Sequence, residues 1–595
     1  MSQQEEKDMA KYFYRASAAD FMRIPGGPIV YSATRQTVDS FENLNSVQDF
    51  ADCRAGLTTG DNTKFQREWT EISFSDIGFG KKNRKDAMAS DKKWFPCSSG
   101  GSFRKWYGNH ETVVNWSNDG HEIRTFAAPD GRLKASPRSL NYYFREGFTW
   151  GKISSGKFSP RYLPEGFIFD DTGQSAFPNQ NEIGPYLLTS LACSKTADFF
   201  LSYISQTMSF NKGDVAKVPV PAHFPRVGSQ AEGCIEITRQ DWDSYEVSWN
   251  FKRVKLLPKN LKEGSLRTVY EEVRANWRDM VVELQLLEES VNGLFIEAYS
   301  LADELTPQAP KEEITLTCNP HYRYGVNRSD AEHEALLRCD TISELVSYAI
   351  GCMMGRYSLD EPGLILASQG ETLQDYLCQI PSPSFAPDDD AILPLTDQEW
   401  FPDDATNRFR EFVRIVWGEE HLQENLDFVA ESLCLNAIKP KRGESSLDTI
   451  RRYLSTQFYK DHMRTYKKRP IYWLFSSGKH KAFECLVYLH RYNEGTLARM
   501  RTEYVIPLSA KLSAYAEKLE QDKDASSSAA ETKRLEKEIA TLHKQQTELA
   551  EFDEKLRHYA DQRISLDLDD GVKVNYGKFG DLLAEVKAIT GEKPQ

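Results

Sequence analysis

One long amphipathic stripe near the middle of the chain limits how the rest can fold. Starting at Leu266, apolar residues recur every three or four positions; they are Val269, Val273, Trp277, Met280, Leu284, Leu287, Val291 and Leu294. This spacing places them on one face of a single continuous helix. Since so long a helix holds the residues before it apart from those after it, we expect it to act as a spacer.

The length of the chain requires several cores. Its 595 residues are several times the usual domain size of roughly 100–200 residues. An apolar share of 40% and an aromatic share of 12% can fill such cores, which excludes a wholly disordered or fibrous protein. We therefore predict an α+β multidomain fold. It comprises a mixed α/β domain over 1–225, a strand and the spacer helix over 226–310, a second mixed α/β domain over 311–505, and a helical hairpin with a C-terminal tail over 506–595.

The hairpin is predicted from a heptad-like repeat near the C-terminus. The repeat has a first arm of Leu508, Leu512, Tyr515 and Leu519 and a second arm of Leu535, Ile539, Leu542, Leu549, Phe552, Leu556 and Tyr559. A polar segment at 522–528 separates the arms. The pattern indicates two helices that fold back on each other.

Charge and cysteine content exclude several classes of protein. The net charge is −14, so any contact with nucleic acid must be local rather than spread over a basic surface. The sequence has neither a run of roughly 18 apolar residues nor an N-terminal signal sequence, which predicts a cytoplasmic protein with no membrane contact. The ten cysteines show no zinc-binding spacing, so we expect reduced thiols and no metal site.

Most catalytic motifs are absent from the sequence. It holds no complete phosphate-binding loop, zinc-binding His-Glu-x-x-His helix or Gly-x-Ser-x-Gly elbow. Asn319-Pro320-His321-Tyr322 differs by one residue from the Asn-Pro-Pro-Tyr of amino-group DNA methyltransferases, but no glycine-rich turn for S-adenosylmethionine lies at a suitable distance before it. We interpret it as an ordinary turn and assign no residue to catalysis.

Local clusters of basic and aromatic residues point to a different function. One runs from Lys81 to Lys93 and continues through Arg104-Lys105-Trp106-Tyr107 to Lys157 and Arg161; another runs from Arg451 to Lys481. Basic groups interleaved with aromatic rings and hydroxyls suit a groove that holds phosphates while a few side chains read base edges. The alternative is that these charges form ordinary solvated surfaces.

Motifs along nearly the whole chain carry a family resemblance. They are GLTTGDNTKF at 56–65, KWFP at 93–96, FRKWYGN at 103–109, GFIFD at 166–170, NKGD at 211–214, DWDS at 241–244, CNP at 318–320, KKRPIYW at 467–473 and LDLDDG at 566–571. In this order they resemble the PglX/BrxX family of adenine-specific DNA methyltransferases from BREX phage-exclusion systems. Members of that family carry a methyltransferase domain ahead of this region, so the resemblance implies a C-terminal half that lacks it.

The resemblance implies a role for each region. Residues 1–225 would be a target recognition domain that binds double-stranded DNA at a short non-palindromic site for adenine N6 methylation and phage exclusion. S-adenosylmethionine would bind the missing N-terminal methyltransferase half, leaving no cofactor in this chain. Expected partners are DNA, that missing half, other BREX components and phage DNA mimics. The expected DNA-binding residues are Thr59, Asn62, Lys64, Arg104, Lys105, Trp106, Tyr107, Asn109, Ser154, Ser155, Lys157, Arg161, Tyr162, Lys467, Lys468, Arg469 and Lys479.

Two other functions are consistent with the sequence. The chain could be a protein-interaction scaffold of a phage-defence complex, in which the helical hairpin docks other proteins and DNA contact is secondary. It could also be a divergent enzyme that is active alone and uses residues 319–322 as a degenerate catalytic motif. A nuclease is disfavoured because no acidic residues pair with a lysine at a suitable spacing.

Overall fold

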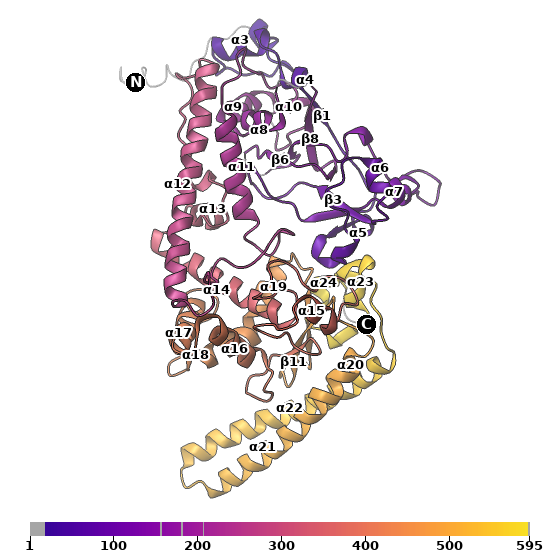
Figure 1. Ribbon diagram of the computed structural model, residues 1–595, viewed down its shortest axis with the longest axis vertical. Coiled ribbons are helices and arrows are strands. Elements are labelled where there is room, and N and C mark those ends of the chain that lie inside the picture. The colour runs from indigo at the N-terminus through magenta and orange to yellow at the C-terminus, as the bar shows by residue number, and fades with distance from the viewer. Residues whose placement is uncertain (1–17, 155–156, 180–182, 206, 593–595) are drawn as a thin grey trace, which may run out of the picture. The chain divides into compact units, whose positions relative to one another are not determined.

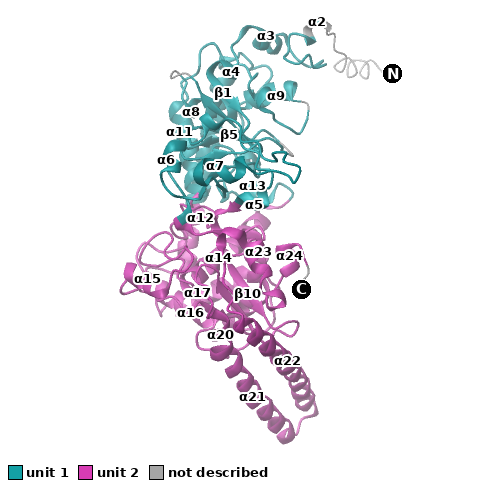
Figure 2. Ribbon diagram, turned by 90° about the vertical axis from the view of Figure 1, so that its right-hand side faces the viewer, with its two compact units in different colours: residues 1–66, 76–242, 276–327 teal, residues 67–75, 243–275, 328–595 magenta. Residues whose placement is uncertain are grey.

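The computed structural model describes residues 18–154, 157–179, 183–205 and 207–592. The chain divides into two compact units (Figure 2). Unit 1 holds residues 1–66, 76–242 and 276–327, and unit 2 holds residues 67–75, 243–275 and 328–595. Helix α12 (Leu266–Ala298) is shared, because its first turns belong to unit 2 and the rest to unit 1.

Two mainly antiparallel sheets form the centre of unit 1. One sheet has the order β1 (Ala51–Arg54), β8 (Gly173–Pro178), β5 (Gly147–Gly151) and β6 (Arg161–Leu163). In a second sheet, β3 (Trp94–Ser98) pairs antiparallel with β4 (Thr112–Asn115) and parallel with β7 (Ile168–Phe169). Strand β2 (Gln66–Glu68) begins at the point where the chain leaves the unit. Trp94 and Trp150 are fully buried, so each sheet contributes a large aromatic side chain to the core.

Short helices surround these sheets (Figure 1). They are α2 (Ala18–Phe21), α3 (Arg35–Asn43), α4 (Val47–Phe50), α5 (Asn62–Phe65), α6 (Arg84–Met88), α7 (Ser117–Arg124), α8 (Pro185–Cys193), α9 (Lys195–Ile204), α10 (Lys212–Val215), α11 (Gly228–Trp242) and α13 (Pro320–Tyr324). The strand expected within 226–310 is wrong, since those residues, all described, contain α11 and α12 but no strand. In α11 the buried residues Ala231, Ile235, Thr238 and Trp242 recur at helical spacing.

Unit 2 is mainly helical. Its helices are α14 (Asp330–Met353), α15 (Leu373–Gln379), α16 (Ala405–Trp417), α17 (Leu422–Leu433), α18 (Ser446–Tyr453), α19 (Tyr459–Thr465), α20 (Thr496–Arg499), α23 (Gly571–Gly577) and α24 (Val586–Thr590), with π-helical turns at Leu454–Phe458 and Met500–Val505. Its sheet has the order β10 (Tyr472–Ser476), β11 (Glu484–Tyr488) and β9 (Ile392–Pro394). One continuous apolar core, from Phe251 to Ile589, joins most of these elements, whereas Tyr376 of α15 packs in a small separate cluster with Leu366 and Ile380.

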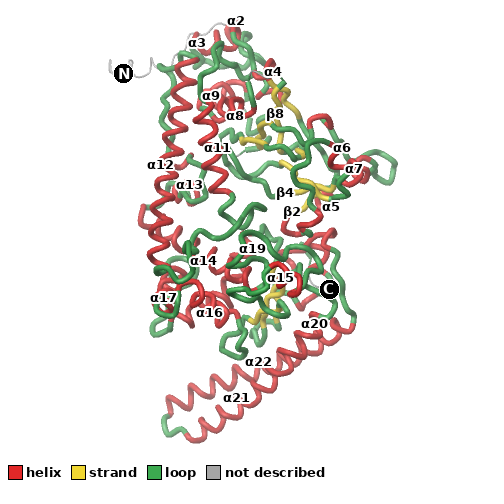
Figure 3. Tube along the Cα trace, viewed as in Figure 1, coloured by secondary structure: helices red, strands yellow, loops and turns green. Residues whose placement is uncertain are grey.

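Two long helices of unit 2 pair side by side: α21 (Ile506–Ala525) and α22 (Ala529–Asp561) (Figure 3). Leu512 and Leu519 of α21 are buried, as are Leu535, Ile539 and Leu542 of α22. Ser528 caps α22 by accepting a hydrogen bond from the Glu531 N–H at 3.4 Å. The predicted α+β class, long central helix and helical hairpin are therefore confirmed. No described helix has an apolar stretch long enough to cross a lipid bilayer.

The core of unit 2 contains a buried polar network around Arg356. Its guanidinium donates to the Tyr488 hydroxyl at 2.9 Å and to the Tyr357 hydroxyl at 3.2 Å. Glu246 accepts hydrogen bonds through one carboxylate oxygen from Tyr466 at 2.9 Å and Ser347 at 3.1 Å. Its other oxygen is buried without a hydrogen-bond partner. Burial raises the pKa of Glu246 to about 7, and attraction to Arg356 only partly opposes this.

This pKa shift makes the stability of unit 2 depend on pH. Because the folded-state pKa is above the unfolded value, the stabilising contribution of Glu246 is complete below about pH 4.5 and is lost as pH rises through 7. We expect Glu246→Gln, which mimics the protonated acid, to raise the thermal midpoint at pH 8 by roughly 2–8 °C and to change it little at pH 4.5. Calorimetry of wild type, Glu246→Gln and the exposed control Glu551→Gln would measure this. Equal midpoints for all three at pH 8 would contradict it.

Candidate nucleic-acid interface

Arg104, a predicted DNA contact, lies inside unit 1. Its side chain is 3% exposed and forms an ion pair with Asp241 at the end of α11, with 2.7 Å between the Nη2 and Oδ2 atoms. It also donates to the Thr317 hydroxyl at 2.9 Å and to the Tyr107 carbonyl at 2.8 Å. Asp241 further accepts from the backbone N–H of Thr317 at 2.8 Å and from that of Cys318 at 3.0 Å. The pair therefore joins three segments that are distant in sequence.

Lys105 and Trp106 both bind Glu288 on α12. The indole N–H of Trp106 donates to Glu288 Oε1 at 2.9 Å, and the Lys105 ammonium pairs with the other carboxylate oxygen. Burial alone would lower the pKa of Lys105, but attraction to Glu288 outweighs it and the pKa is raised. Lys105 thus keeps its charge in the interior, where Glu288 neutralises it.

Arg161, Tyr107 and Tyr162 are also buried. Arg161 donates to the Ser159 carbonyl at 3.2 Å, and burial, followed by repulsion from Arg104, lowers its pKa to about 10. The Tyr162 hydroxyl donates to Glu146. Arg104, Lys105, Trp106 and Arg161 are thus all buried, and each makes hydrogen bonds within unit 1. Their donors serve the interior of unit 1, so direct DNA contact by them stays an untested prediction that burial disfavours.

The remaining predicted residues between 109 and 157 lie nearer the surface. Asn109 is partly exposed and donates to the Ser102 carbonyl at 2.9 Å. Ser154 donates to the Lys157 carbonyl at 3.1 Å, and the exposed Lys157 pairs with Glu313. Ser155 lies outside the described residues. Lys157 is therefore already neutralised by a carboxylate.

The second predicted basic cluster lies in unit 2, and it is only partly open. Lys467 lies 3.6 Å from a Glu68 carboxylate oxygen, and Arg469 lies 3.5 Å from one of Glu71. Lys468 and Lys479 are exposed. The cluster thus offers fewer unneutralised cations than its sequence indicates, and its contact with DNA stays a prediction.

The structure brings other exposed cations together beside Lys64. The loop over residues 126–138, called the basic loop below, folds back on itself through a bridge between Ala127 and Leu133, and it extends outward after α7 (Figure 1). It is pinned to unit 1 where Thr58 and Ser136 exchange backbone hydrogen bonds of 3.1 and 2.8 Å. We call the exposed cations of this loop, Arg132, Lys134 and Arg138, together with the exposed Lys64, the basic loop patch.

An aromatic ring joins two cations of this patch. The Lys64 and Lys134 ammonium groups lie 5.1 and 5.0 Å from the centre of the Phe126 ring. Phe126 in turn packs edge-on against the buried Phe65, with 5.2 Å between ring centroids. Within the described chain, none of the four basic side chains of the patch forms an ion pair with a carboxylate. Two lysines held 5 Å from one ring repel each other, so a bound anion would relieve that repulsion.

One further predicted residue, Asn62, is exposed near Lys64, and the predicted Thr59 lies buried beneath it. Asn62 is exposed at the start of α5, and its side-chain oxygen accepts a hydrogen bond from the buried Thr59 hydroxyl. Sequence reasoning found Thr59, Asn62 and Lys64 but missed Arg132, Lys134 and Arg138. The missed signal was the Pro129-Asp130-Gly131 turn, a typical hairpin tip, with basic residues directly after it.

The near-match to a methyltransferase motif has a structural role. Asn319 is 1% exposed, and its amide nitrogen donates to the carbonyls of Lys311 at 2.7 Å and Ile314 at 2.8 Å. Its side-chain oxygen accepts from the His321 N–H at 3.2 Å and caps α13. Both halves of this amide bond backbone groups in the interior, where an adenine amino group cannot reach them, so the interpretation as a turn is favoured.

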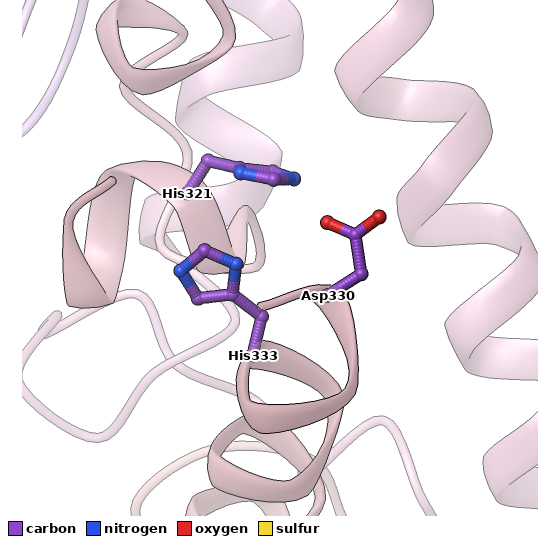
Figure 4. A group of neighbouring side chains, drawn as sticks. All are labelled: His321, Asp330 and His333. Atoms are coloured by element: carbon purple, nitrogen blue, oxygen red, sulfur yellow. The ribbon is translucent and has the colours of Figure 1, made fainter. Parts of the chain in front are cut away.

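Three potential metal ligands lie at the junction between α13 and α14 (Figure 4). His321 belongs to unit 1, whereas Asp330 and His333 lie in the first turn of α14 in unit 2. Each of the three residues takes part in at least one polar or ring interaction. Because they come from different units, we do not assemble a metal site from them.

Comparison with known proteins supplies relatives of the chain. No protein-family model matches it. The chain is homologous to two adenine-specific methyltransferases. It is 48% identical over 581 residues to adenine-specific methyltransferase BrxX of Escherichia coli O9:H4 (strain HS), and 38% identical over 592 residues to adenine-specific methyltransferase PglX of Lacticaseibacillus casei (strain Zhang). Each match covers 97% of this chain but only 46% of the relative, so the chain spans about half the length of both.

Because Arg104 is paired in the interior, we expect its removal to lower the stability of unit 1 rather than to remove a DNA contact. Arg104→Ala leaves Asp241 buried without its cation, which we expect to destabilise unit 1 by about 3–5 kcal/mol. Thermal unfolding, monitored through tryptophan fluorescence, measures this loss of stability. The exposed control Arg138→Ala should change stability by less than about 0.5 kcal/mol. An Arg104→Ala protein with wild-type stability and weakened DNA binding would restore the direct-contact interpretation.

Proposed function

We propose that this chain is the DNA target recognition part of a BREX-type adenine N6 DNA methyltransferase. In this proposal unit 1 binds duplex DNA at a short non-palindromic site, so that the host genome is methylated and phage DNA is excluded. The printed names of the two relatives support the methyltransferase context, since both are adenine-specific. The part of the relatives that this chain does not match would bind S-adenosylmethionine and transfer the methyl group.

The observation that carries the DNA-binding part is the basic loop patch. Its four cations have no carboxylate partners within the described chain, although the protein as a whole has a net charge of −14. The nearby Asp61 and Asp130 accept hydrogen bonds from the backbone N–H groups of Lys64 at 3.1 Å and Arg132 at 3.0 Å. These carboxylates therefore order the two loops. The patch keeps an excess of positive charge where phosphates can be bound.

Asn62 gives the same surface a group that can read bases. An exposed asparagine can accept a hydrogen bond from the N6 amino group of adenine through its amide oxygen and donate one to N7 through its amide nitrogen. Its oxygen accepts from Thr59, which fixes the orientation of the amide, and an amide oxygen has a second lone pair for another bond. The proposal therefore assigns phosphate contacts to the cations and base recognition to Asn62.

Removing two cations of the patch should weaken DNA binding. We expect Lys64→Gln combined with Lys134→Gln to lower affinity for a 30-bp duplex more than about tenfold at moderate salt. The slope of log affinity against log salt should also fall by about 1.8, since two phosphate contacts are lost. Fluorescence anisotropy over a salt series measures both quantities.

A matched control is available in unit 2. Lys537 and Lys544 are exposed on α22, so their double glutamine variant removes the same charge elsewhere. If this control lost as much affinity and slope as the patch variant, binding would depend on net charge alone. In that case the patch would not be the interface.

A second candidate function is favoured by the helical hairpin. Its distal part extends away from the body of unit 2 in both ribbon views (Figures 1 and 2). The buried leucines there, such as Leu519 and Leu535, lie along the facing arms of the hairpin. An arm of this kind could dock other phage-defence proteins, with DNA contact secondary.

A shortened hairpin separates the two functions. Residues after Tyr559 contribute Tyr576 and Phe579 to the unit 2 core, so the C-terminus cannot simply be deleted. Replacing residues 514–546 with a short Gly-Ser linker should leave DNA affinity unchanged if unit 1 is the recognition surface. A pull-down of other BREX components that survives high salt with the intact chain and fails with the shortened one would favour the scaffold.

A further inference from the structure

A short loop of unit 2 carries three exposed cations within five residues. It links α17 to α18, and its sequence is Lys439-Pro440-Lys441-Arg442-Gly443, with every residue exposed. None of its three basic side chains forms an ion pair with a carboxylate of any described residue. The 439–443 loop therefore concentrates unneutralised positive charge in a chain whose net charge is −14.

Contacts with α18 order this loop. The Glu444 carboxylate accepts hydrogen bonds from the Arg452 guanidinium at 2.8 and 2.5 Å and from the Thr449 hydroxyl at 3.0 Å. The backbone N–H of Glu444 donates to the Lys441 carbonyl at 3.4 Å, which closes a turn. Gly443 in that turn has a φ of +78°, which a glycine adopts without strain. The loop backbone is thus fixed before any partner binds, and this lowers the entropy cost of binding.

The stability of the neighbouring helices does not account for these charges. The Leu433 carbonyl at the end of α17 already accepts hydrogen bonds from the N–H groups of Ala437 at 3.0 Å and Ile438 at 3.2 Å, so it needs no cation from the loop. On its other side the loop leads into the N-terminal end of α18, where the helix dipole disfavours cations. A bound anion would be stabilised at that position.

The composition of the loop favours duplex DNA over an acidic protein as the partner. Protein interfaces depend on aromatic and other large side chains in dry pockets and are depleted in lysine, whereas this loop has two lysines and no aromatic residue. Duplex DNA carries one negative charge per about 1.7 Å of helix axis, so even a loop of five residues can meet several phosphates.

We propose that the 439–443 loop binds phosphates of duplex DNA and gives unit 2 a DNA contact that is independent of base sequence. The inference rests on the proposed function, in which unit 1 selects the site. Phosphate contacts position a protein on the duplex but carry no sequence information directly. The loop therefore raises affinity for any duplex, and the choice of site stays with unit 1.

The test removes the three charges and keeps the contacts that order the loop. The variant combines Lys439→Gln, Lys441→Gln and Arg442→Gln and leaves Glu444 in place. We expect its affinity for each of two fluorescein-labelled 30-bp duplexes of unrelated sequence to fall more than about tenfold at moderate salt, by the same factor within about twofold. The slope of log affinity against log salt should fall by about 2.7, because three phosphate contacts are lost. Fluorescence anisotropy over a salt series measures both quantities.

A matched control removes three exposed lysines of α22, Lys533, Lys537 and Lys544, and should bind both duplexes as the wild-type chain does. An unchanged slope in the loop variant, an equal loss in the control, or a loss on only one duplex would overturn the loop contact. The proposed function is tested separately by the Lys64 and Lys134 variant. If the wild-type chain bound neither duplex at low salt, the proposed function would fail and the loop contact with it.

Discussion

A charge removed from water is costly unless an opposite charge or hydrogen-bond acceptors lie beside it, and this constraint organises unit 1. Arg104 pairs with Asp241 on α11, and the next two residues bind Glu288 on α12. A short loop is thereby fixed to two helices whose contact residues lie more than a hundred positions further along the chain. Trp106 adopts a φ of +69°, which is uncommon for a bulky residue, and its bond to Glu288 helps to hold it there.

The same requirement separates two populations of cations in unit 1. Where a carboxylate reaches the cation inside the fold, as for Arg104 and Lys105, the charge stabilises the packing of helices. Lys64 and Lys134 have no such partner in the described chain and lie at the surface. A role in binding a polyanion is therefore supported for the second population, even though the first gives the more basic stretch of sequence.

The sequence predicts helices better than it predicts which charged side chains are exposed. Periodicity located α12, α21 and α22 because a buried stripe repeats with the helical period. It failed at α11, where Ile235-Glu236-Ile237-Thr238 alternates like a strand although the buried positions follow a helix. Charge patterns could not show that Asp241 and Glu288 would reach Arg104 and Lys105, since those contacts depend on tertiary packing.

The candidate site was predictable to a similar degree. Asn62 and Lys64 were found because they lie in a recognisable motif. Arg132 and Lys134 were missed because isolated charges after a turn carry little information in the sequence, and only the fold places Lys134 beside Phe126. The near-motif at Asn319 shows that a sequence can also suggest a functional site where the fold has a structural one. Its residue type suits catalysis, but its buried amide makes hydrogen bonds to three backbone groups.

The pinning of the basic loop at its base also affects how the protein can change over time. Residues 129–134 are all exposed, whereas Ala135 and Ser136 return the chain to the body of unit 1. Substitutions, insertions or deletions at the tip would therefore alter the outer surface without disturbing the tryptophan-rich core. Such a loop can vary in sequence while the scaffold that carries it stays the same.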